Sequence, residues 1–125
     1  MGLAITRGLA TVIATTALFV ASSAPAETLT QLDALSQAAQ SEPAGIALAR
    51  KQADAGDLLD ALATLERVII NLPDGALDAR LYHAALLCRV DDRRGALIEM
   101  DGLRGHDLDP ALREEARNAC SGGGN

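Results

Sequence analysis

Aromatic residues are almost absent from this sequence of 125 residues, which has one Tyr, one Phe and no Trp. Phe19 lies in an N-terminal segment that we expect to be removed, so Tyr82 would be the single aromatic residue of the working protein. Proteins that recognise nucleic-acid bases or sugars commonly stack them on aromatic rings. Such stacking cannot drive ligand recognition here.

Several patterns that carry chemistry are missing as well. No apolar run alternates with period two over more than a few residues, so no β-strand is predicted. The Gly cluster at residues 122–124 precedes no helix, which excludes a phosphate-binding loop there. His83 and His106 are far apart, and no Cys or carboxylate completes a metal-ligand spacing around either one. No nucleophile stands beside a base. We therefore expect a non-enzymatic protein without metal or cofactor.

Acidic residues outnumber basic ones, with 17 Asp and Glu against 11 Lys and Arg and a formal net charge of −6. A surface of this charge repels phosphate backbones and anionic lipids, so we expect neither nucleic acid nor a membrane surface as a partner. The charges are interspersed with apolar residues, which is typical of a solvated helical surface.

Residues 1–26 have the organisation of a secretory signal peptide. Arg7 precedes an apolar run over residues 9–20, and Ala24-Pro25-Ala26 offers the small residues that a signal peptidase accepts. As a helix this run spans about 18 Å, against the roughly 30 Å of a bilayer core, which favours cleavage after Ala26 over retention as an anchor. The mature protein, residues 27–125, would then be periplasmic or secreted.

Six helices are predicted in the mature chain, from apolar residues at helical spacing and from Ser, Asp, Gly and Pro at the helix ends. They cover residues 27–40, 43–54, 57–71, 77–90, 93–103 and 110–119, and a flexible tail follows at 121–125. The predicted N-caps are Thr28 or Thr30, Ser41, Asp57, Asp91 or Asp92, and Asp109. The first helix has a narrow apolar stripe, so we expect it to be lightly held. The fold class is all-α.

Two helix pairs repeat at a step of 35 residues: Ala49 matches Ala84, Ala61 matches Ala96, Leu65 matches Met100, and Val68 matches Leu103. The first pair resembles the tetratricopeptide repeat family, with a small–Gly–bulky–Ala–bulky–Pro signature at Ala49, Gly56, Leu58, Ala61, Leu65 and Pro73. In the second pair, Asp91 and Arg93 replace the usual Gly and large apolar residue.

This resemblance implies a short right-handed α-solenoid of two helix hairpins, at residues 42–75 and 77–110. The flanking helices at 27–41 and 111–120 would act as caps. The alternative is a generic helical bundle with accidental periodicity, since helices rich in Ala and Leu match many templates.

The family resemblance also implies an exported bacterial module for protein–protein interaction. In such folds the first helix of each pair lines a concave face that binds a peptide or helix. The matching positions here are Ile46, Arg50, Leu81, Tyr82, Ala85 and Arg89. Arg50 and Arg89 would pair with carboxylates of the partner, and Tyr82 would give a rigid contact surface. For each of the six residues the alternative is a solvated charge or a helix-packing residue. The alternatives are a self-associating subunit, forming a homo-oligomer, and an accessory subunit of an envelope enzyme or transport system.

Cys88 and Cys120 are the only cysteines, and export would carry both into an oxidising compartment. In the repeat arrangement they end the fourth and sixth helices, which lie parallel and adjacent. We expect a disulfide that closes a loop of about 30 residues and contributes on the order of 3 kcal/mol. The alternative is a buried Cys88 and a free Cys120. For His83 we expect a partly buried structural role on the fourth helix.

Overall fold

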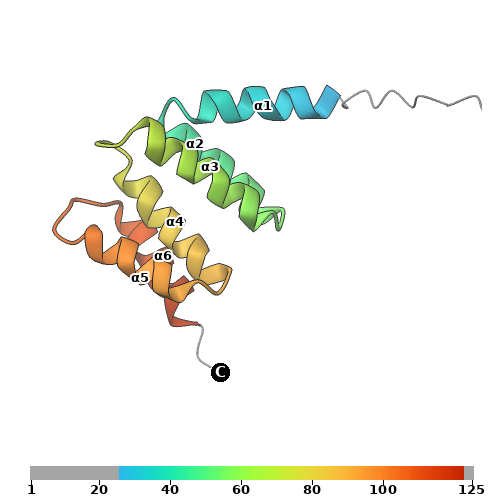
Figure 1. Ribbon diagram of the computed structural model, residues 1–125. Coiled ribbons are helices and arrows are strands. Elements are labelled where there is room, and N and C mark those ends of the chain that lie inside the picture. Colours follow the sequence, from blue (N-terminus) through green and yellow to red (C-terminus); the bar gives the residue numbers. More distant parts are fainter. Residues whose placement is uncertain (1–25, 123–125) are drawn as a thin grey trace, which may run out of the picture.

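The computed structural model describes residues 26–122, which form six helices and no strand. The helices are α1 (Ala26–Ala38), α2 (Glu42–Asp54), α3 (Leu58–Asn71), α4 (Leu77–Arg89), α5 (Arg93–Gly102) and α6 (Pro110–Ser121) (Figure 1). The all-α prediction is confirmed, and each predicted helix is present within two residues of its expected bounds. None of the helices over residues 26–122 combines the length and apolar character needed to cross a membrane.

Two predicted segments lie largely outside the described residues. The expected signal peptide at residues 1–26 is one of them, apart from Ala26, where α1 begins. The other is the expected tail, of which residues 123–125 are not described. Ser121, predicted as the first residue of that tail, is instead the last residue of α6, and its hydroxyl donates to the carbonyl of Arg117 at 2.7 Å.

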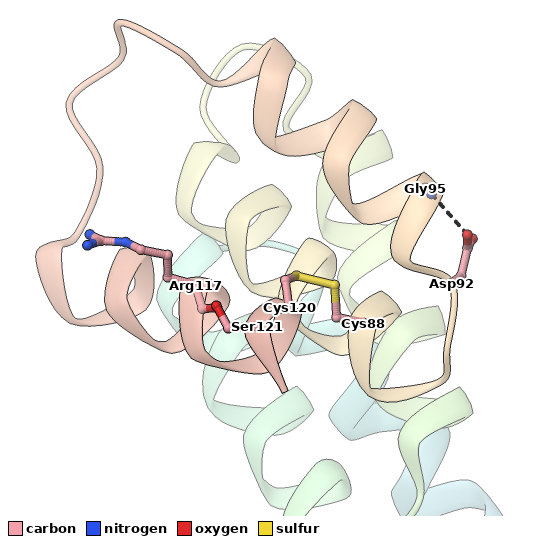
Figure 2. The surroundings of a disulfide bond; sticks show 6 residues. All are labelled: Cys88, Asp92, Gly95, Arg117, Cys120 and Ser121. Atoms are coloured by element: carbon pink, nitrogen blue, oxygen red, sulfur yellow. Dashed lines mark hydrogen bonds between the residues drawn. A yellow bond between two sulfur atoms is a disulfide. The ribbon is translucent and has the colours of Figure 1, made fainter. Parts of the chain in front are cut away.

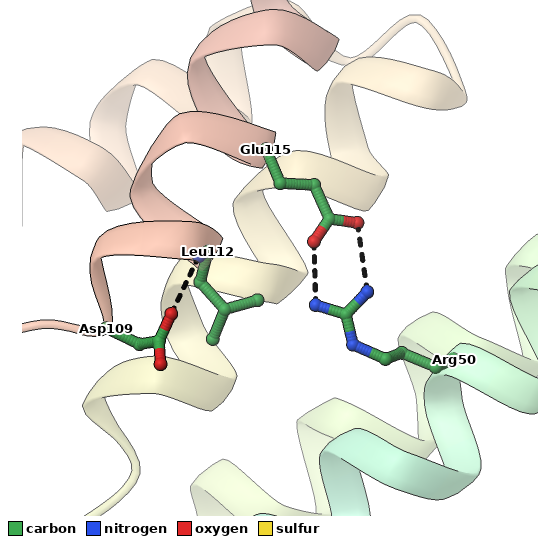
Figure 3. Close-up of polar contacts among 4 residues, drawn as sticks. All are labelled: Arg50, Asp109, Leu112 and Glu115. Atoms are coloured by element: carbon green, nitrogen blue, oxygen red, sulfur yellow. Dashed lines mark hydrogen bonds and ion pairs between the residues drawn. The ribbon is translucent and has the colours of Figure 1, made fainter.

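Side-chain caps fix where three of the helices begin. In each case a side-chain oxygen accepts a hydrogen bond from a backbone N–H of the first turn, which has no partner inside the helix. The three bonds are Ala44 to Ser41 at 3.3 Å, Gly95 to Asp92 at 2.9 Å, and Leu112 to Asp109 at 2.9 Å (Figures 2 and 3). Asp57 is the N-cap residue of α3 as predicted, but its side chain makes no cap hydrogen bond.

The turns inside the two helix pairs have the same geometry at the same step of 35 residues. Gly56 and Asp91 both have a positive φ, of 91° and 67°. The next residue of each turn donates its N–H to the carbonyl five residues earlier: Asp57 to Gln52 at 2.9 Å, and Asp92 to Leu87 at 2.8 Å. Such a bond is typical of a helix that ends in a left-handed residue. Asp91 therefore adopts the backbone of the Gly it replaces, and Asp tolerates that conformation better than most residues.

α4 is the central helix and packs against α2, α3, α5 and α6. Residues 81–86 are all buried, so this stretch of α4 has no side that faces solvent. A helix surrounded on every side is apolar all round instead of carrying one apolar stripe. The largest side chains of the core come from α3 and α4, and they are Tyr82, Leu65, Leu81, Leu86 and Val68.

Carboxylates tie together the N-terminal ends of α2, α4 and α6. Glu42, in the first turn of α2, accepts a hydrogen bond from the N–H of Ala79 in the first turn of α4, at 2.8 Å. Asp78 of α4 accepts one from the N–H of Asp109, the N-cap of α6, also at 2.8 Å. A carboxylate is favourable at a helix N-terminus because the helix dipole places positive partial charge there. The three helices therefore begin side by side.

The Cys88–Cys120 disulfide joins α4 and α6 at their other ends (Figure 2). The two Cα atoms are 5.2 Å apart, and the cysteines are 32 residues apart in sequence. The predicted disulfide is thus present in the structure. Since hydrogen bonds hold the N-terminal ends and a covalent bond holds the C-terminal ends, α4 and α6 run parallel and are fixed to each other at both ends.

α2 and α3 approach each other closely at Gly45. A Cβ atom added to Gly45 would collide with the side chain of Val68, so any larger residue would push α2 away from α3. Across the same interface the buried hydroxyl of Thr64 donates to the side-chain oxygen of Gln52 at 2.7 Å. This bond satisfies a polar group that would be costly to bury alone.

α1 is held by its C-terminal end. Ala38 and Ala39 are buried where α1 meets α2 and α3, and Asn71 donates to the carbonyl of Ala39 at 3.4 Å. Further towards the N-terminus, Leu29 and Leu32 are 65% and 51% exposed. Figure 1 shows this part of α1 extending away from the other helices. The expectation of a lightly held flanking helix is confirmed.

Removing the disulfide should destabilise the protein strongly. Replacing both cysteines, as Cys88→Ser and Cys120→Ser together, should lower the free energy of unfolding by about 3 kcal/mol, because the unfolded chain regains the freedom of the closed loop. Thermal unfolding followed by circular dichroism should show a melting temperature lower by roughly 15 °C. A reductant should have the same effect on the native sequence and none on the double variant. An unchanged melting temperature in reductant would contradict this assignment.

Candidate interaction surfaces

The structure places the six predicted contact residues in different environments. Leu81, Tyr82 and Ala85 are only 2%, 2% and 1% exposed, whereas Ile46 and Arg50 are half-buried and Arg89 is exposed. A side chain without exposed surface cannot touch a partner. Leu81, Tyr82 and Ala85 are therefore core residues, which corrects their predicted role. The physical reason is that residues 81–86 of α4 are covered by the neighbouring helices, with α6 packed directly against α4.

Arg50 is engaged inside the protein (Figure 3). Its guanidinium donates two hydrogen bonds to the carboxylate of Glu115 on α6, at 2.7 and 3.3 Å. The same group lies over the ring of Tyr82, 4.6 Å from its centre, which is a favourable cation–π distance. The hydrogen bond to Glu115 raises the pKa of Arg50, and burial raises the pKa of Tyr82, so neither group changes its charge near neutral pH.

This ion pair runs from α2 to α6 across the face of α4. The concave binding surface was predicted on this face, where Arg50 would pair with a carboxylate of a partner. In the structure, Glu115 of the same chain supplies the carboxylate. The Arg50–Glu115 ion pair spans this face, so Arg50 is already paired within the chain. Arg89, by contrast, has no ion pair with any residue that the structure describes.

His83 joins α3, α4 and α5 from a buried position. Its ring nitrogen Nδ1 lies 2.8 Å from a carboxylate oxygen of Glu99 on α5, and Nε2 lies 3.6 Å from Glu66 on α3. The structural role expected for His83 fits this placement. Burial lowers the pKa of His83, but the hydrogen bond and charge of Glu99, together with the charge of Glu66, outweigh burial and raise that pKa above its ordinary value.

A hollow of about 320 Å³ lies beside this buried histidine. We refer to it as the α3–α5 hollow, and its lining residues are Ile69, Arg80, Ile98, Glu99, Gly102 and Leu103. Ile98 is 65% exposed at the rim. The lining of the hollow thus combines apolar side chains with one acidic and one basic group.

A second surface, on α5, shares Ile98 with the α3–α5 hollow. We refer to it as the α5 surface, and it is made of Arg93, Arg94, Leu97, Ile98, Asp101 and Arg104. Leu97 is 51% exposed, although its spacing with Ala96 and Met100 is that of a packing residue. Arg104 pairs with Asp101 at 2.8 Å, while Arg93 and Arg94 have no ion pair in the described part of the chain. The α5 surface contains three arginines and one aspartate, so it is locally positive on a chain with net charge −6.

Sequence reasoning missed the α5 surface, although a signal was present. Ala96, Leu97 and Ile98 are consecutive apolar residues. Consecutive residues on a helix are separated by about 100°, so three of them cover an arc wider than one packing face. Only Ala96 of the three is buried.

No group of three or more His, Cys, Asp or Glu side chains among the described residues is arranged to hold a metal ion. In comparisons with known proteins, the chain matches no family model, and no curated protein or solved structure is significantly similar to it.

The ion pair of Arg50 should contribute modestly to stability. Both side chains are more than a third exposed, so Arg50→Ala should lower the free energy of unfolding by about 1 kcal/mol, ion pair and cation–π contact together. Arg50→Glu should lower the free energy of unfolding further, because it places a second carboxylate beside that of Glu115. Combining Arg50→Glu with Glu115→Arg should restore part of the loss in urea unfolding. Arg89→Glu is the matched control and should leave the free energy of unfolding nearly unchanged. If it lowered that free energy as much as Arg50→Glu does, a specific Arg50–Glu115 pair would be refuted.

The buried histidine should make stability depend on pH. Because the folded protein raises the pKa of His83 above 6.5, its protonated form is stabilised on folding. This contribution is complete below the ordinary pKa and is lost as the pH rises through the raised value. Urea midpoints measured between about pH 6 and pH 9 should therefore fall more steeply for the native sequence than for His83→Gln. Equal slopes in the native protein and His83→Gln would disprove the effect.

Proposed function

We propose that this protein is an exported, non-enzymatic module of the bacterial cell envelope, similar to tetratricopeptide repeats, that binds another protein through its α5 surface. The observation that carries the proposal is the combination of exposed Leu97 and Ile98 with Arg93 and Arg94, which form no ion pair within residues 26–122, on an otherwise acidic protein. Apolar side chains beside arginine are a common composition of protein interaction sites.

The repeat arrangement is supported by the turns at Gly56 and Asp91, which share one geometry at a step of 35 residues. The side-by-side N-termini of α2, α4 and α6 also support it, because first helices of successive repeats stack in parallel. In a right-handed solenoid of two hairpins, α6 takes the place of the next first helix and acts as a cap. Stacking this third helix accounts for the burial of Leu81, Tyr82 and Ala85.

Export is supported by the disulfide, which is compatible with an oxidising compartment. The disulfide agrees with the signal-peptide pattern of residues 1–26. Together, the disulfide and this pattern support a periplasmic or secreted location. A small helical protein gains stability from such a covalent link where its core is limited.

The α5 surface suits a partner segment of particular chemistry. Its apolar centre, Leu97 and Ile98, would bury leucine-like side chains, while Arg93 and Arg94 would pair with carboxylates at the edge. The occupant is then an amphipathic helix or peptide that is acidic beside its apolar side chains. An accessory subunit of an envelope complex would use the same surface.

Charge reversal on α5 tests the proposal. With tagged protein exported to its own compartment and recovered with its partners, Arg93→Glu together with Arg94→Glu should reduce recovery of the partner by about tenfold or more, because it replaces attraction by repulsion. Arg89→Glu is the matched control on the originally expected face and should retain the partner. If Arg89→Glu abolished recovery of the partner and the Arg93→Glu, Arg94→Glu double variant did not, binding would be assigned to the face that contains Arg89 and this proposal would be rejected.

A further inference from the structure

The N-terminal part of α1 is an arm that carries exposed apolar side chains. Leu29, Leu32 and Asp33 lie within an arc of about 100° on this helix, since Asp33 follows Leu29 by four residues and Leu32 by one. Leu29 and Leu32 are 65% and 51% exposed, and Asp33 is exposed beside them. The arm therefore carries two leucines flanked by a carboxylate.

The apolar face of the arm is little packed. α1 has 13 residues, and among residues 29–38, whose side chains the structure describes, only Ala38 is buried. An isolated helix of about this length is marginal in water, and most helical stability comes from packing an apolar face. A surface that covers Leu29 and Leu32 would supply that packing.

The α5 surface has the matching chemistry. Its exposed Leu97 and Ile98 lie beside Arg94, which is unpaired, as Leu29 and Leu32 lie beside Asp33. Apolar groups thus face apolar groups when the two elements meet, and a carboxylate faces a guanidinium. This charge complementarity holds between two parts of one sequence.

We propose that the α5 surface binds the α1 arm of a second copy of this chain. The inference rests on the proposed function, because it takes the same surface and names its occupant. Binding within one chain is excluded by the fold: Figure 1 places α1 and α5 at opposite ends of the molecule, and α1 is anchored at Ala38 and Ala39. Each copy has one arm and one α5 surface, so two copies satisfy both contacts in a closed, two-fold symmetric pair.

The first experiment removes the apolar contact. Sedimentation of the exported protein, with its disulfide intact, should show a concentration-dependent shift from one chain to two. Leu29→Ser with Leu32→Ser should weaken association on the order of 100-fold, since each buried leucine contributes roughly a factor of ten or more. Leu59→Ser is the matched control, because Leu59 is 75% exposed on α3 outside the contact, and it should leave association unchanged.

The second experiment exchanges the charges. Asp33→Arg alone and Arg94→Asp alone should each weaken association about tenfold, because like charges then meet in both contacts of the pair. An equimolar mixture of the two variants should regain association. In the mixed pair, the altered arm meets the altered α5 surface, and the native arm meets the native surface. Recovery in the mixture is not expected from a general loss of folding.

The outcomes separate this inference from the proposed function. A protein that stays monomeric across the concentration series, or a mixture that fails to recover, overturns the second-copy occupant. If the α5 charge reversal still abolishes recovery of an envelope partner, the proposed function stands with a different occupant. If charge reversal on α5 changes neither association nor partner recovery, both proposals fall.

Discussion

The burial of residues 81–86 of α4 is the constraint on which the rest of this structure depends. Four helices pack around it, and residues 81–86 are removed from water together. Helix packing of this kind supplies most of the stability of a small all-α protein, because the apolar area buried outweighs any single polar contact. The carboxylates of Glu42 and Asp78 and the Cys88–Cys120 disulfide then fix the ends of the packed helices.

The same packing decides which surfaces remain for binding. With α6 against α4, the face expected to hold a guest is filled by Tyr82 and bridged by Arg50 and Glu115. Exposed apolar side chains are found instead on the outer helices α1, α3 and α5. Apolar area that is exposed beside unpaired charge is more informative than scattered single residues, and α5 has both in one place.

Much of the fold was predictable from local sequence. Helix ends were set by Ser41, Asp92, Asp109 and the residues around Gly56, since caps and left-handed turns act over four to six residues. The disulfide was predictable because only two cysteines were present and both ended helices expected to be parallel. Asp57 also precedes its helix as predicted, but its side chain makes no cap hydrogen bond, and nothing in the structure explains this.

The sequence by itself determined the helices, their turns, the 35-residue step, and the acidic, aromatic-poor surface, because each depends on near neighbours or on composition. Only the tertiary structure decided that Tyr82 is buried, that Arg50 pairs with Glu115 sixty-five residues away, and that Leu97 and Ile98 stay exposed. The physical reason is that exposure is a property of what packs on a residue. The covering helix, α6, comes late in the chain, and its position against α4 is not encoded in the residues that it covers.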